Sequence, residues 1–218
     1  MMLKISTNQL LQYVSKQVEN FFPDKYSLKE VINANLRKTL DRVEYCFSKI
    51  NNKYYFKDGK VVFDYQHTDQ YAAFLYFLSN TIWENSSDLI AANKVYSLNK
   101  ALHGIDVFYE VQLPDIFFFS HPVGTVLGRA KYSDYLIVSQ GVTVGGNKEL
   151  VYPVFGEGTY LFSGSAIVGD SKIGANNLIS IGSIIREENT PDNVIVYKSN
   201  GEIKCKPLKW SVKSRYFR

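Results

Sequence analysis

The sequence has little cysteine, little histidine and no long apolar run. Its two cysteines, Cys46 and Cys205, lie far apart without a CxxC spacing, so we expect a reduced, cytoplasmic protein and predict no metal site. The apolar run at 116–119 is far shorter than the roughly 18 residues that span a bilayer. The N-terminus becomes polar too soon for a signal peptide. The sequence therefore predicts neither a membrane span nor a secreted protein.

Neither sign of charge dominates, since the formal net charge is +4 over 218 residues. Basic residues gather in the tail from Lys198 to Arg218, where Glu202 is the single acidic residue. This tail is either a solvated surface or an anion site. Nucleic-acid binding is not predicted, because the excess of positive charge is confined to the tail and no recognition motif accompanies it.

The first half has helical periodicity, with apolar residues three and four positions apart. Four helices are expected, with their capping residues: residues 7–21 capped by Thr7, residues 28–50 with a Ser27–Glu30 capping box, residues 68–83 capped by Thr68 or Asp69, and residues 87–102 capped by Ser87 and ended by Gly104. Residues 53–65 interrupt them and predict a β-hairpin that turns at Asp58-Gly59.

The second half has a period of six. Apolar residues recur without a break at Phe155, Leu161, Ile167, Ile173, Ile179 and Ile185. Val138 and Val144 keep this spacing upstream, and Val126 and Tyr132 extend it less regularly. A small or turn-forming residue stands two positions before most of the apolar ones, as in Pro153, Thr159, Ser165, Ser171, Asn177 and Ser183.

Each six-residue unit is interpreted as a short strand plus a tight turn, and three units close one triangular coil that must stack on its neighbours. The fold class predicted is mainly β: a left-handed parallel β-helix preceded by an α-helical domain. The domains expected are 1–104 (helical), 105–190 (β-helix) and 191–218 (a basic hairpin and tail). A polar loop at 145–152 breaks the repeat once, and such loops often carry function.

Three histidines are candidates for chemistry. His121 stands where the period changes, and it is either a catalytic base or a structural side chain. His67 and His103 lie at expected helix ends, where histidines are usually structural or solvated. His67 and Asp69 also head a helix, which makes them candidate residues for binding an acceptor.

Several motifs resemble those of the serine O-acetyltransferases, which are hexapeptide-repeat acyltransferases. They are Gly104-Ile-Asp106, the stretch from Ser120-His121 to Gly128, Val142-Thr-Val-Gly-Gly146, Gly156-Glu-Gly158 and the repeats themselves. The resemblance is close over roughly residues 100–190. It implies an acetyl-coenzyme A-dependent acetyltransferase that forms homotrimers, with the cofactor in the groove between neighbouring prisms.

The resemblance also implies roles for individual residues. His121 matches the catalytic base, and Asp106, fifteen residues earlier, matches the carboxylate that orients it. An imidazole suits the removal of a proton from an acceptor hydroxyl, and a carboxylate on its other nitrogen fixes the tautomer. Cofactor contacts are expected from the 145–152 loop and from the backbone of later coils, at Gly145, Gly146, Lys148, Ala166, Gly182 and Ser183.

The sequence departs from the family on the acceptor side. Ser120 stands where the serine enzymes have an aspartate, and Tyr152 stands where they have a second histidine. The acceptor is therefore serine or a sugar hydroxyl, as in the synthesis of bacterial surface polysaccharides, with Ser120 and Tyr152 among its expected contacts. Two alternatives stay open: N-acetylation of an amino sugar, and a non-catalytic β-helix used for assembly.

Overall fold

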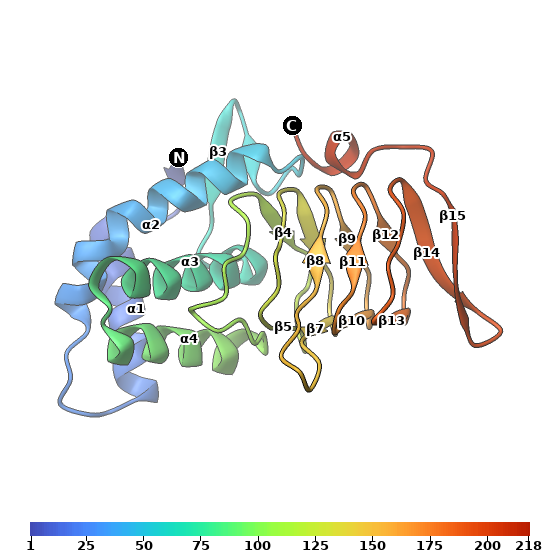
Figure 1. The fold of residues 1–218 in the computed structure, drawn as a ribbon. Coiled ribbons are helices and arrows are strands. Elements are labelled where there is room, and N and C mark those ends of the chain that lie inside the picture. The colour runs from blue at the N-terminus through green and yellow to red at the C-terminus, as the bar shows by residue number, and fades with distance from the viewer.

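The computed structural model describes residues 1–218 and has two parts (Figure 1). Helices occupy one end, and short strands are stacked at the other. The helices are α1 (Thr7–Phe21), α2 (Lys29–Lys49), α3 (Thr68–Ser86) and α4 (Leu89–His103). The helix α3 packs against both α2 and α4 and is buried at every position from Asp69 to Ile82. A helix that is largely apolar on all sides belongs in the middle of such a group.

All four expected helices are present, but their caps differ from those predicted. Ser6, not Thr7, caps α1 and forms a capping box with Gln9. The helix α2 begins after Leu28 without a side-chain cap, so the Ser27–Glu30 box is wrong. His67 precedes α3 without a capping bond.

Asp88, not Ser87, caps α4 through the backbone N–H of Ala91. Ser87 instead ends α3 in a left-handed conformation, with φ of 51°. A helix begins where a side-chain oxygen reaches an unpaired N–H, and the sequence offers neighbouring candidates for that role. Gly104 ends α4 as predicted.

The hairpin expected at 53–65 is confirmed. Its strands β2 (Phe56–Lys57) and β3 (Lys60–Phe63) pair antiparallel, and the turn residues Asp58 and Gly59 both have positive φ. The N-terminal strand β1 (Met2–Leu3) adds to β3 in parallel.

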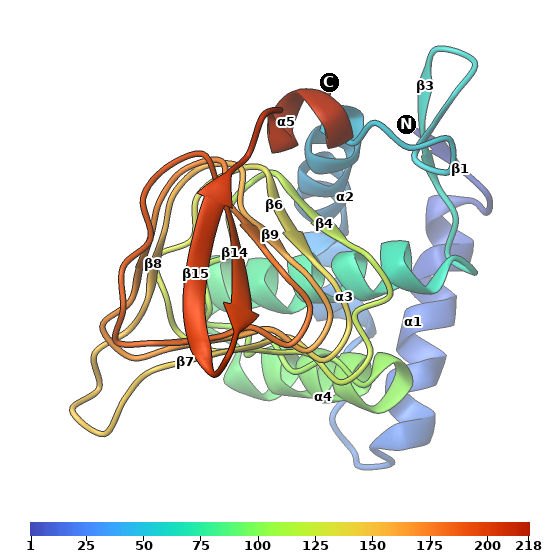
Figure 2. The same ribbon diagram turned by 90° about the vertical axis from the view of Figure 1, so that its right-hand side faces the viewer.

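After residue 116 the chain visits three sheets in turn, and the strands that successive coils add to a sheet are parallel (Figure 2). The first and last coils reach the third sheet only through the isolated bridges of Lys131 to Val154 and of Thr190 to Ile173. The first sheet holds β4 (Phe117–Phe119), β6 (Leu136–Val138), β9 (Tyr160–Leu161), β12 (Leu178–Ile179) and β14 (Val194–Ser199). The second holds β5 (Val126–Leu127), β7 (Thr143–Gly145), β10 (Ala166–Val168) and β13 (Ile184–Arg186). The third holds β8 (Val154–Phe155) and β11 (Lys172–Ile173).

The register of the strands follows the six-residue repeat. Leu178 pairs with Tyr160, eighteen positions earlier, which is three repeats. Ala166 pairs with Thr143, twenty-three positions earlier, because the loop at 145–152 lengthens that coil. The loop therefore leaves the stack and returns without disturbing the register of later coils.

The repeat residues point into the prism as predicted. All six from Phe155 to Ile185 are at most 3% exposed, and Val138 and Val144 are also buried. The irregular extension is wrong at Val126, which is 41% exposed while its neighbour Leu127 is buried. The prism core joins the core of the helices in one apolar cluster.

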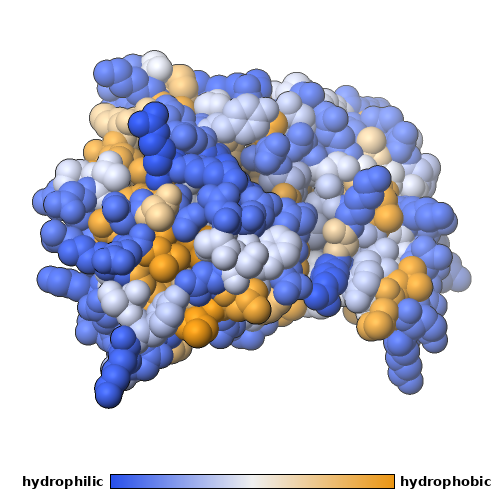
Figure 3. Space-filling model, turned by 60° about the vertical axis from the view of Figure 1, so that its left-hand side comes forward, coloured by the Kyte–Doolittle hydropathy of each residue, from blue (hydrophilic) through white to orange (hydrophobic).

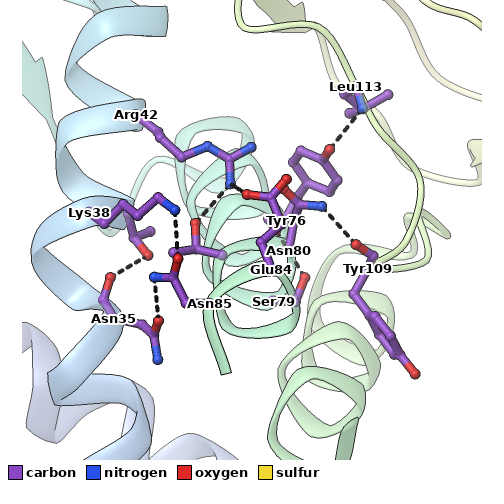
Figure 4. A network of polar contacts seen from close by, with 12 residues as sticks. Asn35, Lys38, Arg42, Tyr76, Ser79, Asn80, Glu84, Asn85, Tyr109 and Leu113 are labelled. Carbon is purple, nitrogen blue, oxygen red and sulfur yellow. Dashed lines mark hydrogen bonds and ion pairs between the residues drawn. The ribbon is translucent and has the colours of Figure 1, made fainter. Parts of the chain in front are cut away.

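Hydrogen bonds fix the helices to the segment that enters the first coil (Figure 4). Asn80 of α3 donates to the carbonyl of Tyr109 at 2.8 Å. The hydroxyl of Tyr76 donates to the Val111 carbonyl and accepts from the Leu113 N–H. A side chain of α3 thus replaces the strand partner that this segment lacks.

The C-terminal hairpin is confirmed, with β15 (Glu202–Pro207) antiparallel to β14 around Asn200 and Gly201. The chain then turns back along the prism through α5 (Val212–Tyr216) to the helical end (Figures 1 and 2). There the backbone N–H of Arg218 donates to the carbonyl of Lys49 at 2.7 Å. The end of the basic tail is therefore packed against α2.

The surface on the helical side is largely hydrophilic, with separate apolar areas (Figure 3). Leu89 and Ile90, at the start of α4, are each 54% exposed. None of the helices combines the length and apolar character that crossing a membrane requires.

Candidate active site

His121 lies at the corner between β4 and β5, where the first coil meets the helices. Its backbone is in the left-handed region, with φ of 54°. Its side chain is 83% exposed. The backbone N–H of His121 donates to Oδ2 of Asp69 at 3.1 Å, and the same oxygen lies 3.9 Å from Nδ1 of the imidazole. The structure thus joins two predicted site residues from opposite halves of the sequence.

A hollow of about 260 Å³ adjoins this contact. It is bounded by the start of α3, the end of α4 and the corner that follows His121. Its lining residues are Thr68, Asp69, Leu102, His103, Gly104, Pro122 and Val123. A small space with one nearly buried carboxyl group suits a small polar acceptor.

His103 is the second titratable side chain of this hollow. Its Nδ1 lies 2.8 Å from Oδ1 of Asn99. Burial lowers the pKa of His103 to about 4, against the opposing effects of Asn99 and of the Asp69 charge. His103 is therefore a neutral imidazole at neutral pH.

Asp106 does not contact His121 within the chain. Its Oδ1 accepts from the Tyr96 hydroxyl at 2.6 Å and its Oδ2 accepts from Lys100 at 2.5 Å. Burial raises the pKa of Asp106, but the hydrogen bonds from Lys100 and Tyr96 outweigh it and hold the pKa below its usual value. Both oxygens of the predicted orienting carboxylate are thus already bonded to α4.

The loop at 145–152 forms one side of a second, larger groove of about 910 Å³. Lys148 and Arg186 supply positive charge to it, and Gly146, which has no side chain, lines it with backbone atoms. Gly145, Val168 and Arg186 stack in register on three successive coils. Asn147 donates to Glu187 at 3.1 Å and so ties the loop to the end of β13.

The other predicted cofactor residues lie on the later coils. Ala166 begins β10, and its N–H donates to the carbonyl of Ser183 at 2.9 Å. Ser183 faces the prism interior, and its buried hydroxyl has no hydrogen-bond partner. Gly182 is an exposed corner with φ of 66°. These residues contribute backbone, not polar side chains, to the outer surface.

The predicted acceptor residues are divided among different hollows of the single chain. Ser120 precedes His121 and is half-buried. Tyr152 lines a third hollow with Arg129 and Glu110, which form an ion pair at 3.0 Å. His67 lines a fourth hollow beside Tyr54. Of the four predicted acceptor residues, only Asp69 lines the hollow that adjoins His121.

Sequence reasoning missed two residues of these sites. His103 lines the hollow near His121, although its helix-end position favoured a structural role. Arg186 lines the groove of the 145–152 loop. Its position directly after the buried repeat residue Ile185 could have identified it as outward-facing, because outward residues alternate with buried ones along a strand.

A scan against models of protein families finds no match. Curated relatives are serine acetyltransferases. That of Synechococcus elongatus is 28% identical over 103 residues, which is 45% of this chain and 42% of the relative. That of Staphylococcus epidermidis is 26% identical over 119 residues, 53% of this chain and 55% of the relative. The chain thus spans about half the length of the curated relatives it matches.

Solved structures extend the likeness to the whole fold. A serine acetyltransferase in complex with cysteine has a TM-score of 0.75 at 15% identity, covering 96% of this chain and 84% of that one. The chain is serine acetyltransferase-like. Another serine acetyltransferase, in complex with coenzyme A, has a TM-score of 0.71 at 16% identity, covering 91% and 84%. The Neisseria gonorrhoeae enzyme in complex with serine has a TM-score of 0.70 at 19% identity, covering 94% and 84%.

Proposed function

We propose that this serine acetyltransferase-like chain is an acetyl-coenzyme A-dependent O-acetyltransferase built on a left-handed parallel β-helix. The observation that carries the proposal is the position of His121. Its exposed imidazole stands beside a small hollow, on a corner whose backbone is held by Asp69. The relatives in sequence and in fold are serine acetyltransferases, and the fold is also found in one of them bound to coenzyme A.

The groove beside the 145–152 loop fits the donor. Lys148 and Arg186 offer cations for phosphate groups, while Gly145 has open space where a side chain would stand. The acidic residues Glu149, Asp170 and Glu187 share the groove, so the fit is to a molecule with separate anionic and neutral parts. Acetyl-coenzyme A is such a molecule, with phosphates at one end and an uncharged pantetheine arm.

The chemistry requires a base and hydrogen-bond donors. Coenzyme A supplies the acetyl group as a thioester, which needs no covalent enzyme intermediate. His121 accepts the proton of the acceptor hydroxyl as the new C–O bond forms, and returns it to the leaving thiolate of coenzyme A as the C–S bond breaks. Backbone N–H groups near Gly145 and Gly146 are the proposed donors to the developing oxyanion. Two carboxyl groups, Asp106 and Asp69, are candidates to orient the imidazole.

We propose that the acceptor hydroxyl belongs to serine or to a sugar. Residues 1–104 form one wall of the hollow through α3 and α4, and residues 105–190 carry His121 and the donor groove. Serine is supported by the relatives, one of which is solved with serine bound. A sugar is supported by the side chains Ser120 and Tyr152, which carry hydroxyls in place of charges.

A homotrimer is the proposed working form. Apolar side chains are exposed along the sheet of β5 and β13, namely Val126 (41%) and Ile184 (53%), and at the adjacent corners Val123 (64%) and Ile181 (72%). Such a row on a prism is a surface for a neighbouring copy. The hollow that adjoins His121 and the groove beside the 145–152 loop share no lining residue within one chain, and a neighbouring prism offers a way to bring His121 and such a groove together.

The test is a thiol-release assay with acetyl-coenzyme A and, separately, serine, amino sugars and nucleotide sugars. We expect release with a hydroxyl acceptor, and a loss of at least about 100-fold in His121→Asn. Asparagine tolerates the left-handed backbone at this corner, so the variant should stay folded and bind coenzyme A as the wild type does. Full activity in this variant would show that His121 is not the base.

The same assay separates the alternatives. Product analysis distinguishes acetylation on oxygen from acetylation on the nitrogen of an amino sugar, since only an ester is cleaved by mild base. The absence of thiol release with every acceptor, together with the absence of coenzyme A binding, would favour a non-catalytic assembly module.

A further inference from the structure

Two carboxyl groups compete for the role of orienting His121. The resemblance assigns that role to Asp106, but its oxygens are occupied by Tyr96 and Lys100. Neither oxygen of Asp106 contacts the imidazole of His121 within the chain, and turning the carboxylate toward it would disturb the charged hydrogen bond to Lys100. Charge-assisted bonds of this kind are among the stronger ones in proteins.

The carboxyl group of Asp69 already lies close to the imidazole of His121. Its side chain is 9% exposed, whereas that of His121 is 83% exposed, so a buried carboxyl group stands beside an exposed ring that has room to turn. The separation of 3.9 Å between Oδ2 and Nδ1 is longer than a hydrogen bond. Hydrogen bonds of catalytic groups are often long before substrate binds, and a rotation of the exposed ring would shorten this one.

The backbone of His121 gives a second reason. A left-handed conformation is unfavourable for a residue with a Cβ, and it persists only where the surroundings hold it. The hydrogen bond from the His121 N–H to Asp69 holds it here. The same carboxyl oxygen therefore fixes the backbone of His121 and approaches its Nδ1.

We propose that Asp69, and not Asp106, is the positioning residue for His121. Its carboxylate favours the tautomer with the proton on Nδ1, which leaves Nε2 free to accept the proton of the acceptor hydroxyl. The imidazolium that results lies next to the same carboxylate. Asp106 instead anchors the start of the first coil to α4. The catalytic part of this inference rests on the proposed function, since it takes His121 as the base.

The tautomer can be measured without any enzymatic activity. Nitrogen-15 NMR of the unliganded protein distinguishes protonation on Nδ1 from protonation on Nε2, and the chain has only three histidines to assign. We expect the proton of neutral His121 on Nδ1 in the wild type and mainly on Nε2 in Asp69→Asn. His121→Asn identifies the signal. A wild-type proton on Nε2 overturns the proposal, whether or not any variant folds.

Kinetics provide the second measurement. Asp69→Asn keeps an oxygen that can accept from the His121 N–H but removes the charge, so kcat should fall at least tenfold while KM for acetyl-coenzyme A changes less than about threefold. Asp106→Asn should lower the melting temperature more and kcat less. Asp64→Asn removes a nearby carboxylate that contacts the N–H of Gln66 instead, and it is the charge-matched control.

The outcomes separate this proposal from the proposed function. If Asp106→Asn shifts the tautomer and lowers kcat while Asp69→Asn does neither, Asp106 is the partner and the proposal is wrong. If Asp69→Asn shifts the tautomer but the wild type acetylates no acceptor, the positioning contact stands and the proposed function fails.

Discussion

The coil stack and the helical part bury their apolar side chains in different ways. In the stack, each six-residue unit sends one apolar side chain into the prism, and successive coils place these side chains in register. In the helical part, α3 is enclosed on all sides by its neighbours, with large aromatic residues such as Phe74 and Phe77 among its buried side chains. The stack therefore depends on neighbouring coils, and the helical part depends on contacts between distant segments.

The candidate site lies where these two modes of packing meet. Asp69 belongs to the enclosed helix and is buried, whereas His121 belongs to a corner of the first coil and is exposed. Successive coils of the stack place Val168 and Arg186 in register along the groove beside the 145–152 loop. The helical part supplies the single buried carboxyl group that a uniform repeat does not offer.

The largest effect that separates the two parts is expected from a cavity in the stack. Ile173→Ala should lower the free energy of unfolding by about 2–5 kcal/mol, because Ile173 is 3% exposed and the coils above and below cannot close the gap. Lys172→Ala, on the outer face of the same strand, should change it by less than about 0.5 kcal/mol. Chemical denaturation measures both. Equal losses would mean that the prism interior is not the core of the stack.

The stack could be predicted from sequence because its interactions are local. The repeat from Phe155 to Ile185 fixes which residues point inward, and the coil length follows from the same spacing. The prediction was wrong at Val126. Leu127 pairs with Val144, seventeen positions later and not eighteen, so Leu127 turns inward instead. The six-residue spacing therefore fails in the first coil, which is one residue shorter there than three repeats.

The site was less predictable, because its contacts join segments far apart in the sequence. Asp69 and His121 were each named from sequence, but no spacing rule connects residues fifty-two positions apart. The motif spacing pointed instead to Asp106, which is close to His121 in sequence but is bonded to α4. Likewise, the path of the tail from β15 back to α2 follows from packing at Phe217 and not from a local pattern.

An acid-dependent loss of stability should sharpen the comparison, because it arises on the helical side of the site. The pKa of His103 is lowered by burial to about 4, below the value of about 6.5 for an unfolded chain. The unfolded state therefore binds more protons between these values. Above about pH 6.5 His103 should therefore not change the free energy of unfolding. Below that pH the free energy of unfolding should fall by up to about 1.4 kcal/mol for each pH unit, until about pH 4.

His103→Asn is the matched variant, since an amide can keep a hydrogen bond to Asn99 but does not titrate. Unfolding by urea at pH 7, 6 and 5 should show a smaller acid loss in this variant than in the wild type. An equal slope in both proteins would mean that His103 is not responsible.

The smallest expected effect compares two helices within the helical part. Ser6 accepts from the Gln9 N–H at 3.2 Å, and the Gln9 side chain accepts from the Ser6 N–H at 2.9 Å, so Ser6→Ala should cost about 1 kcal/mol. Ser27 has the same sequence signature with Glu30, but α2 begins without a side-chain cap. Ser27→Ala should therefore leave the free energy of unfolding within about 0.3 kcal/mol of the wild type. Thermal unfolding of the two variants side by side measures the difference, and an equal loss in Ser27→Ala would restore the capping box that the sequence pattern predicts.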